Sequence, residues 1–63
     1  MIAESSHKIE VFHYVSDDET MIETLMVRGS ESYRLRIEER DYGYVFHEYV
    51  NGVLVRSAVI YHE

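Results

Sequence analysis

The dipeptide Asn51-Gly52 is the strongest local structural signal in this sequence. Both residues accept the positive φ that a two-residue hairpin turn requires. The segments 41–50 and 53–62 on either side are rich in valine, tyrosine and other strand-forming residues. A loop of this length sets the register, and it predicts these facing pairs: Val50 and Val53, Tyr49 and Leu54, Glu48 and Val55, His47 and Arg56, Phe46 and Ser57, Val45 and Ala58, Tyr44 and Val59.

Two further segments alternate between polar and apolar residues, as strands with one buried face do. In the segment 8–15, the side chains of residues 9, 11, 13 and 15 share one face. In the segment 33–38, Tyr33, Leu35 and Ile37 are expected to point inward, and the charged residues between them outward. The residues 39–41 then predict a charged turn that leads into the hairpin.

The segment from Ser16 to Gly29 is open to two interpretations. Ser16 and Glu19 have the spacing of a helix capping box, and the acidic residues 17–19 suit the positive end of a helix dipole. Met21, Ile22, Leu25 and Met26 have helical spacing. The alternative is a hairpin with its turn at 16–19 and a strand at 20–28, which the β-branched residues of that stretch support. We favour the helix, because the capping signals and the apolar spacing agree.

These elements predict a single α+β domain over residues 1–63, in the order strand, helix, strand, strand, strand. The helix is expected to pack on one face of a small antiparallel sheet. The residues that best fit this covered face are Tyr44, Phe46, Val53, Val55, Val59 and Tyr61.

The second face of the predicted sheet is unusually apolar for a face in water. It carries Val45, Tyr49, Leu54, Ala58 and Ile60, mixed with His47, Arg56 and His62. Exposed apolar patches mark contacts with other proteins, and tyrosine, which occurs six times, is enriched in such contacts. We therefore expect either a homodimer through this face or a twisted sheet that wraps part of the face inward.

Charge and composition argue against several classes of partner and compartment. Twelve acidic residues oppose six basic ones, and phosphate binding needs a basic surface, so no direct nucleic-acid partner is expected. The absence of cysteine removes disulfide and thiol chemistry and fits a cytoplasmic protein. No apolar run is long enough to cross a membrane, and residues 1–6 do not resemble a signal peptide.

Residues with catalytic or metal-binding chemistry form no known motif here. His7, His13, His47 and His62 lack the spacing of a zinc site, so neither a metal nor a cofactor is expected. The serines lie in no nucleophile elbow, and the carboxylates near residue 40 are expected to be solvated. We therefore expect a protein that is not an enzyme.

Acidic side chains can instead imitate DNA. Alternate residues on a strand lie about 6–7 Å apart, broadly similar to the spacing of phosphates along a DNA strand. The candidates for such a role are Glu4, Glu10, Asp17, Asp18, Glu19 and Glu23. The alternative to DNA mimicry is that each of these carboxylates is an ordinary solvated surface charge.

In size, acidity, lack of cysteine and predicted element order, the chain resembles the small acidic phage inhibitors of uracil-DNA glycosylase. Those proteins carry a Glu-Ser-apolar motif at the start of an edge strand. Glu4-Ser5-Ser6 matches it in part, with a serine in place of the apolar residue, and Glu31-Ser32 is a second Glu-Ser pair that is followed by Tyr33.

The resemblance implies that Glu4 and Ser5 approach the DNA-binding cleft of the enzyme. It also implies an apolar pocket between helix and sheet, lined by Met21, Ile22, Leu25 and Met26, which captures the side chain that the enzyme inserts into DNA. The predicted function is therefore a DNA-mimicking, non-enzymatic inhibitor of uracil-DNA glycosylase. The alternative is a homodimeric β-sheet interaction module with a cellular protein partner.

Overall fold

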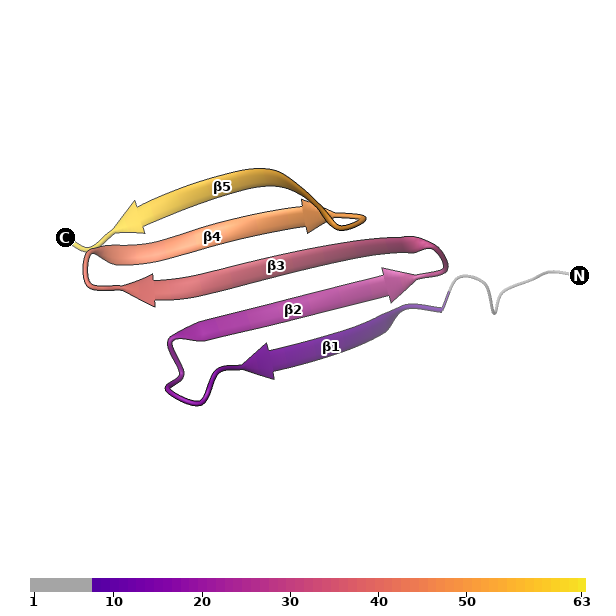
Figure 1. The fold of residues 1–63 in the computed structure, drawn as a ribbon, viewed down its shortest axis with the longest axis horizontal. Helices are drawn as coiled ribbons and strands as arrows, with labels where there is room; N and C mark the ends of the chain where they lie inside the picture. The colour runs from indigo at the N-terminus through magenta and orange to yellow at the C-terminus, as the bar shows by residue number, and fades with distance from the viewer. Residues whose placement is uncertain (1–7) are drawn as a thin grey trace, which may run out of the picture.

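The computed structural model describes residues 8–63 and contains one antiparallel sheet (Figure 1). Its strands are β1 (Glu10–Val15), β2 (Met21–Arg28), β3 (Glu31–Arg40), β4 (Gly43–Val50) and β5 (Val53–Tyr61). Each strand pairs with the next one in the sequence, so the order across the sheet is β1-β2-β3-β4-β5. The described residues contain no helix, and the predicted α+β fold is wrong: the fold is an all-β meander. In residues 8–63 there is accordingly no helix that could cross a membrane.

The segment 16–29 folds as the hairpin that was the alternative interpretation. β1 pairs with β2 from Glu10–Val27 to Val15–Ile22. Ser16, expected to cap a helix, closes the turn instead: its Oγ accepts bonds from the backbone N–H groups of Thr20 (3.2 Å) and Met21 (3.0 Å). The prediction failed because the short polar side chains that cap helices also close turns, and pairing with strands on both sides decided between the two.

The expected helical face does not exist. On a strand, successive side chains point to opposite faces, so Ile22 and Met26 lie on one face of the sheet and Met21 and Leu25 on the other. The alternation predicted for the segment 33–38 is confirmed in β3, which pairs with β2 on one side and β4 on the other.

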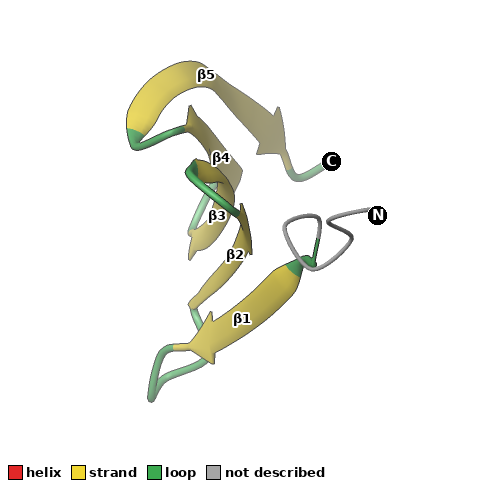
Figure 2. Cartoon of the chain, turned by 90° about the vertical axis from the view of Figure 1, so that its right-hand side faces the viewer, coloured by secondary structure: helices red, strands yellow, loops and turns green. Residues whose placement is uncertain are grey.

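The pairing defines two faces. The apolar face consists mainly of Val11, His13, Val15, Ile22, Thr24, Met26, Tyr33, Leu35, Ile37, Tyr44, Phe46, Glu48, Val50, Val53, Arg56, Ala58 and Ile60, and it also carries Arg28, Glu31 and Glu39 near its ends. The opposite face has charged residues along the central strands, chiefly Glu23, Arg34, Arg36, Glu38 and Arg40, and we call it the charged face. Figure 2 shows the sheet from the side as one curved layer.

The β4–β5 hairpin turns at Asn51 (φ 51°) and Gly52 (φ 83°), as the sequence predicted. The predicted pairs Val50–Val53 and Tyr49–Leu54 are confirmed. A register shift between Glu48 and Tyr49 then makes every later predicted pair wrong by one residue, so that Glu48 faces Arg56. Such a bulge bends its strand, and β5 is visibly curved in Figure 2.

The bulge also changes which side chains share a face. Ala58 and Ile60 join Phe46 on the apolar face, whereas Val59 and Tyr61 lie on the charged face. The two predicted faces of this hairpin are therefore wrong beyond the bulge. The physical reason is the side-chain period of two, since one extra residue moves every later side chain to the other face.

We expect replacement of the two hairpin glycines by alanine to lower the free energy of unfolding by unequal amounts. A Cβ at Gly43 (φ 151°) would lie 2.0 Å from the carbonyl oxygen of Ile60, whereas one at Gly52 (φ 83°) meets nothing within 4 Å. We expect Gly52→Ala to lower the free energy of unfolding by about 1 kcal/mol. Gly43→Ala should cost roughly 1–3 kcal/mol more, because the strands must separate. Urea denaturation at one protein concentration measures both, and equal losses would contradict the close contact at Gly43.

A second prediction concerns Asp18 in the β1–β2 turn. Its Oδ1 accepts bonds from Thr20 Oγ1 (2.7 Å) and Ser16 Oγ (2.8 Å). These bonds, that from Thr20 first, lower the pKa of Asp18 below its ordinary value of 3.8. The stabilisation is present above pH 3.8 and is lost as the pH falls through the lower folded pKa. In Thr20→Val, NMR titration should show the Asp18 pKa moving up toward 3.8, and no movement would refute the role of Thr20.

Candidate functional site

The apolar face is the candidate functional site, because no second layer of the described chain covers it (Figure 2). No hydrophobic side chain among residues 8–63 is buried. On this face Val11 is 51% exposed, Ile22 45% and Ile60 57%. Sheets with an apolar face are stable when a second layer packs against it, and residues 8–63 supply no such layer.

The chain exposes more surface than a folded monomer of its mass usually does. The chain exposes 5091 Å², whereas a folded monomer of its mass is expected to expose about 4,200 Å². The difference is close to the roughly 800 Å² that each partner buries in a protein–protein interface of standard size. This excess belongs to the whole single-layer sheet, with both of its faces.

A small polar cluster lies in the middle of the apolar face. The Tyr33 hydroxyl donates a hydrogen bond to Glu48 Oε2, and on the other side Arg56 Nε forms an ion pair with Glu48 Oε1 at 3.1 Å. Both carboxylate oxygens of Glu48 are thus engaged, and its side chain is only 24% exposed. The charges of this cluster cancel, so it can be covered at lower cost than a lone carboxylate.

Two open hollows, each of about 320 Å³, lie on the same face. One surrounds the polar cluster and is lined by Leu35, Phe46 and Ile60 among others. The other lies near the β2–β3 and β4–β5 turns, where Met26, Tyr33 and Val50 line it. Such hollows can receive protruding side chains of a partner, which gives an interface its shape complementarity.

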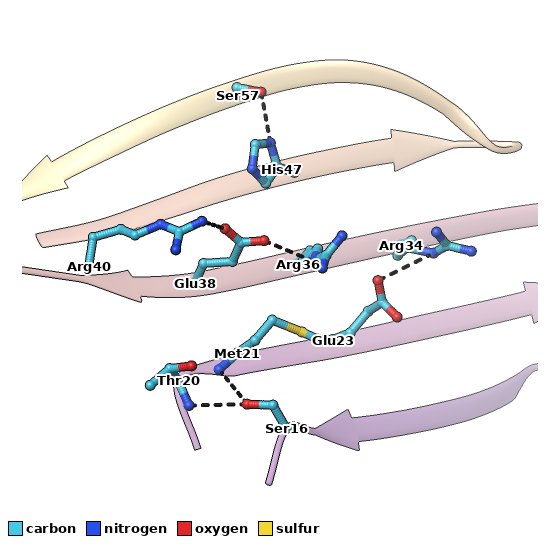
Figure 3. A network of polar contacts seen from close by, with 10 residues as sticks. All are labelled: Ser16, Thr20, Met21, Glu23, Arg34, Arg36, Glu38, Arg40, His47 and Ser57. Carbon is cyan, nitrogen blue, oxygen red and sulfur yellow. Dashed lines mark hydrogen bonds and ion pairs between the residues drawn. The ribbon is translucent and has the colours of Figure 1, made fainter. Parts of the chain in front are cut away.

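The charged face is different, since its charges neutralise one another (Figure 3). Arg34 Nε lies 3.8 Å from Glu23 Oε2, and Glu38 contacts both Arg36 and Arg40. The Arg36 Nε atom lies 3.2 Å from Glu38 but makes no hydrogen bond, so this contact is electrostatic only. We interpret this face as the solvated one, with ion pairs that contribute little stability individually.

The residues predicted to form the site are not brought together. Glu4, Ser5 and Ser6 lie outside the described residues. Met21 and Leu25 lie on the charged face, and Ile22 and Met26 lie on the apolar face. The pocket between helix and sheet therefore does not form in the described chain, because that part has no helix.

The other sequence candidates also have structural roles. Glu31 and Ser32 begin β3 beside β2, away from the sheet edge, and Glu31 pairs with Arg28 at 3.1 Å. His13 shares a hydrogen bond with Thr24 (3.0 Å), and His47 shares one with Ser57 (3.2 Å). Within residues 8–63 no three potential ligands gather as a metal site would require.

Sequence reasoning missed the Tyr33–Glu48–Arg56 cluster. Tyr33 was assigned correctly to an inward face, but the predicted register placed Val55, not Arg56, opposite Glu48. The bulge that brings Arg56 to Glu48 has no glycine to mark it. The attraction between Glu48 and Arg56 is the one signal that could have favoured the shifted register.

The cluster predicts a measurable titration. The hydrogen bond to Glu48, helped by burial and by the Glu48 charge, raises the pKa of Tyr33 above its ordinary value of 10.0. The stabilisation is present below pH 10.0 and is lost as the pH rises through the higher folded pKa. Glu48→Gln should bring the Tyr33 pKa down toward 10.0 in an NMR titration. Glu31→Gln is the control, and a Tyr33 pKa that responds equally to both variants would contradict the cluster.

Comparisons with known proteins identify no relative of this chain. The chain was compared with protein-family models, with curated proteins and with solved structures, and none of the three comparisons found a match. The function must therefore be argued from the geometry of the apolar face.

Proposed function

We propose that this chain is a non-enzymatic, cytoplasmic protein-interaction module that works as a homodimer, with the apolar face of each copy covering that of the other. The observation that carries the proposal is a broad apolar face in a chain whose described residues bury no hydrophobic side chain. Two such sheets packed face to face form a β-sandwich, the common way to bury the apolar faces of antiparallel sheets.

A second copy fits this face in size and shape. The face spans five strands at a spacing of about 4.8 Å, and an identical face matches it in both dimensions. A symmetric dimer uses the same patch on both subunits, so the exposed area on each side is equal by construction. A chain of 63 residues without disulfides buries little hydrophobic surface by itself. In the dimer, the two apolar faces together form the hydrophobic core.

Charge also permits self-association through this face. Of the charged residues on this face, Glu48 pairs with Arg56 and Arg28 pairs with Glu31, and Glu39 lies at its acidic margin. All but one unit of the net charge of −6 therefore resides elsewhere and does not oppose contact at the centre of the face. A paired Glu48 and Arg56 inside the interface would also favour one register of the two sheets over others.

Inhibition of uracil-DNA glycosylase stays a prediction of the sequence resemblance. Its apolar pocket required a helix, and residues 8–63 form strands and turns only. Its Glu4-Ser5 contact lies outside the described residues. What remains in support is the acidity of the chain, and uracil excision from an oligonucleotide in the presence of excess protein is the direct assay.

Two neighbouring residues of β5 offer a matched test of the homodimer. Ile60 lies on the apolar face and is 57% exposed, and Val59 lies on the charged face and is 42% exposed. We expect the wild-type protein to sediment as a dimer at micromolar concentration. Ile60→Glu should raise the dimer Kd at least tenfold, or about 1.4 kcal/mol, because an unpaired carboxylate would be buried.

Val59→Glu is the control and should leave the dimer intact. Circular dichroism of both variants at high protein concentration checks that the sheet still forms. A wild-type protein that stays monomeric at tens of micromolar would refute the homodimer. Equal weakening by the two variants would show that the contact does not use the apolar face.

A further inference from the structure

The two ends of the sheet differ strongly in charge. The β1–β2 turn, the β3–β4 turn and the C-terminal end of β5 lie together at the left of Figure 1, and we call this the acidic end. It carries one basic residue, Arg40, and these acidic residues: Asp17, Asp18, Glu19, Glu38, Glu39, Asp41 and Glu63.

The opposite end, at the right of Figure 1, is formed by the start of β1 and by the β2–β3 and β4–β5 turns. Among residues 8–63 its charged residues are Lys8, Glu10, Arg28 and Glu31, whose formal charges cancel. We call it the neutral end. Seven acidic residues and one basic residue thus give the acidic end a formal charge of −6, against 0 for the neutral end.

Two-fold symmetry allows two aligned ways to pack this sheet against a copy of itself through the apolar face. If the symmetry axis runs along the strands, the strands of both copies point the same way and the two acidic ends meet. If the axis runs across the strands, each acidic end lies over the neutral end of the other copy. The angle of about 30° between packed sheets leaves this distinction intact.

We propose that the second copy packs in the second way, with its strands antiparallel to those of the first. This inference rests on the proposed homodimer and specifies its arrangement. Packed sheets lie about 10 Å apart, close to the screening length of roughly 8 Å at physiological ionic strength. Two adjoining acidic ends would therefore still repel each other, whereas an acidic end beside the neutral end of the partner avoids this repulsion.

The middle of the apolar face is compatible with this arrangement. His13, Thr24, Leu35, Glu48 and Arg56 form one row across the five strands, about midway between the two ends. An axis along this row brings the row of one copy against the same row of the other. Because Glu48 and Arg56 neutralise each other within each copy, the row carries no net charge to oppose the contact.

Distances between spin labels distinguish the two arrangements. The chain contains no cysteine, so Ser30→Cys gives a single labelling site in the exposed β2–β3 turn at the neutral end. In the antiparallel arrangement the two labels lie at opposite ends of the sandwich. Since ten residues of strand span about 33 Å, pulsed electron paramagnetic resonance should give a separation of roughly 30 Å or more. A separation under about 20 Å would overturn the inference while leaving the homodimer standing.

A charge variant gives an independent measurement. Ser30→Lys adds a positive charge to the neutral end, which faces the acidic end of the partner in the antiparallel arrangement. We expect its dimer Kd to fall several-fold at low salt, with the gain lost at high salt. In the parallel arrangement the two new lysines would meet each other, so a higher Kd at low salt would overturn the inference. A protein that shows no dimer by sedimentation would overturn both the inference and the homodimer.

Discussion

The structure depends on the backbone ladders that join each strand to the next, because within residues 8–63 it has no buried hydrophobic core to hold it. β3 is the centre of this arrangement, since its ten residues pair with β2 on one side and β4 on the other. Cross-strand contacts reinforce the ladders on both faces, such as Glu48 with Arg56 and Arg34 with Tyr49. Ladders and surface pairs alone give modest stability, and the apolar face is where the remaining stabilisation is available.

The sequence was informative where a signal was local. Asn51-Gly52 specified its turn and the first two pairs of the hairpin, and the alternation of residues 33–38 identified the two faces of β3. It failed where the outcome depended on partners distant in sequence. Ser16 and Glu19 have the same chemistry in a helix cap and in a turn, and β2 became a strand because β1 and β3 pair with it on both sides.

The candidate site could be anticipated in kind but not in detail. An apolar sheet face suited to self-association was expected at Val45, Tyr49, Leu54, Ala58 and Ile60. In the structure Val45, Tyr49 and Leu54 lie on the charged face, and the bulge near Glu48 places Ala58 and Ile60 on the apolar face instead, beside Phe46. A bulge without glycine leaves no mark in a single sequence, since it arises from the competition between turn geometry and cross-strand pairing. The charge difference between the two ends is likewise invisible until the meander brings separate turns to the same end of the sheet.

The order of the strands also bears on how the chain folds. Every strand pairs with its neighbour in the sequence, so each hairpin closes over a short loop and the contacts are local. Chains with local contacts fold quickly for their class, because little loop entropy is lost before pairing begins. For the proposed homodimer, the slow step of assembly is then the encounter of two formed sheets. Its refolding rate should accordingly increase with protein concentration, and its thermal midpoint should do the same.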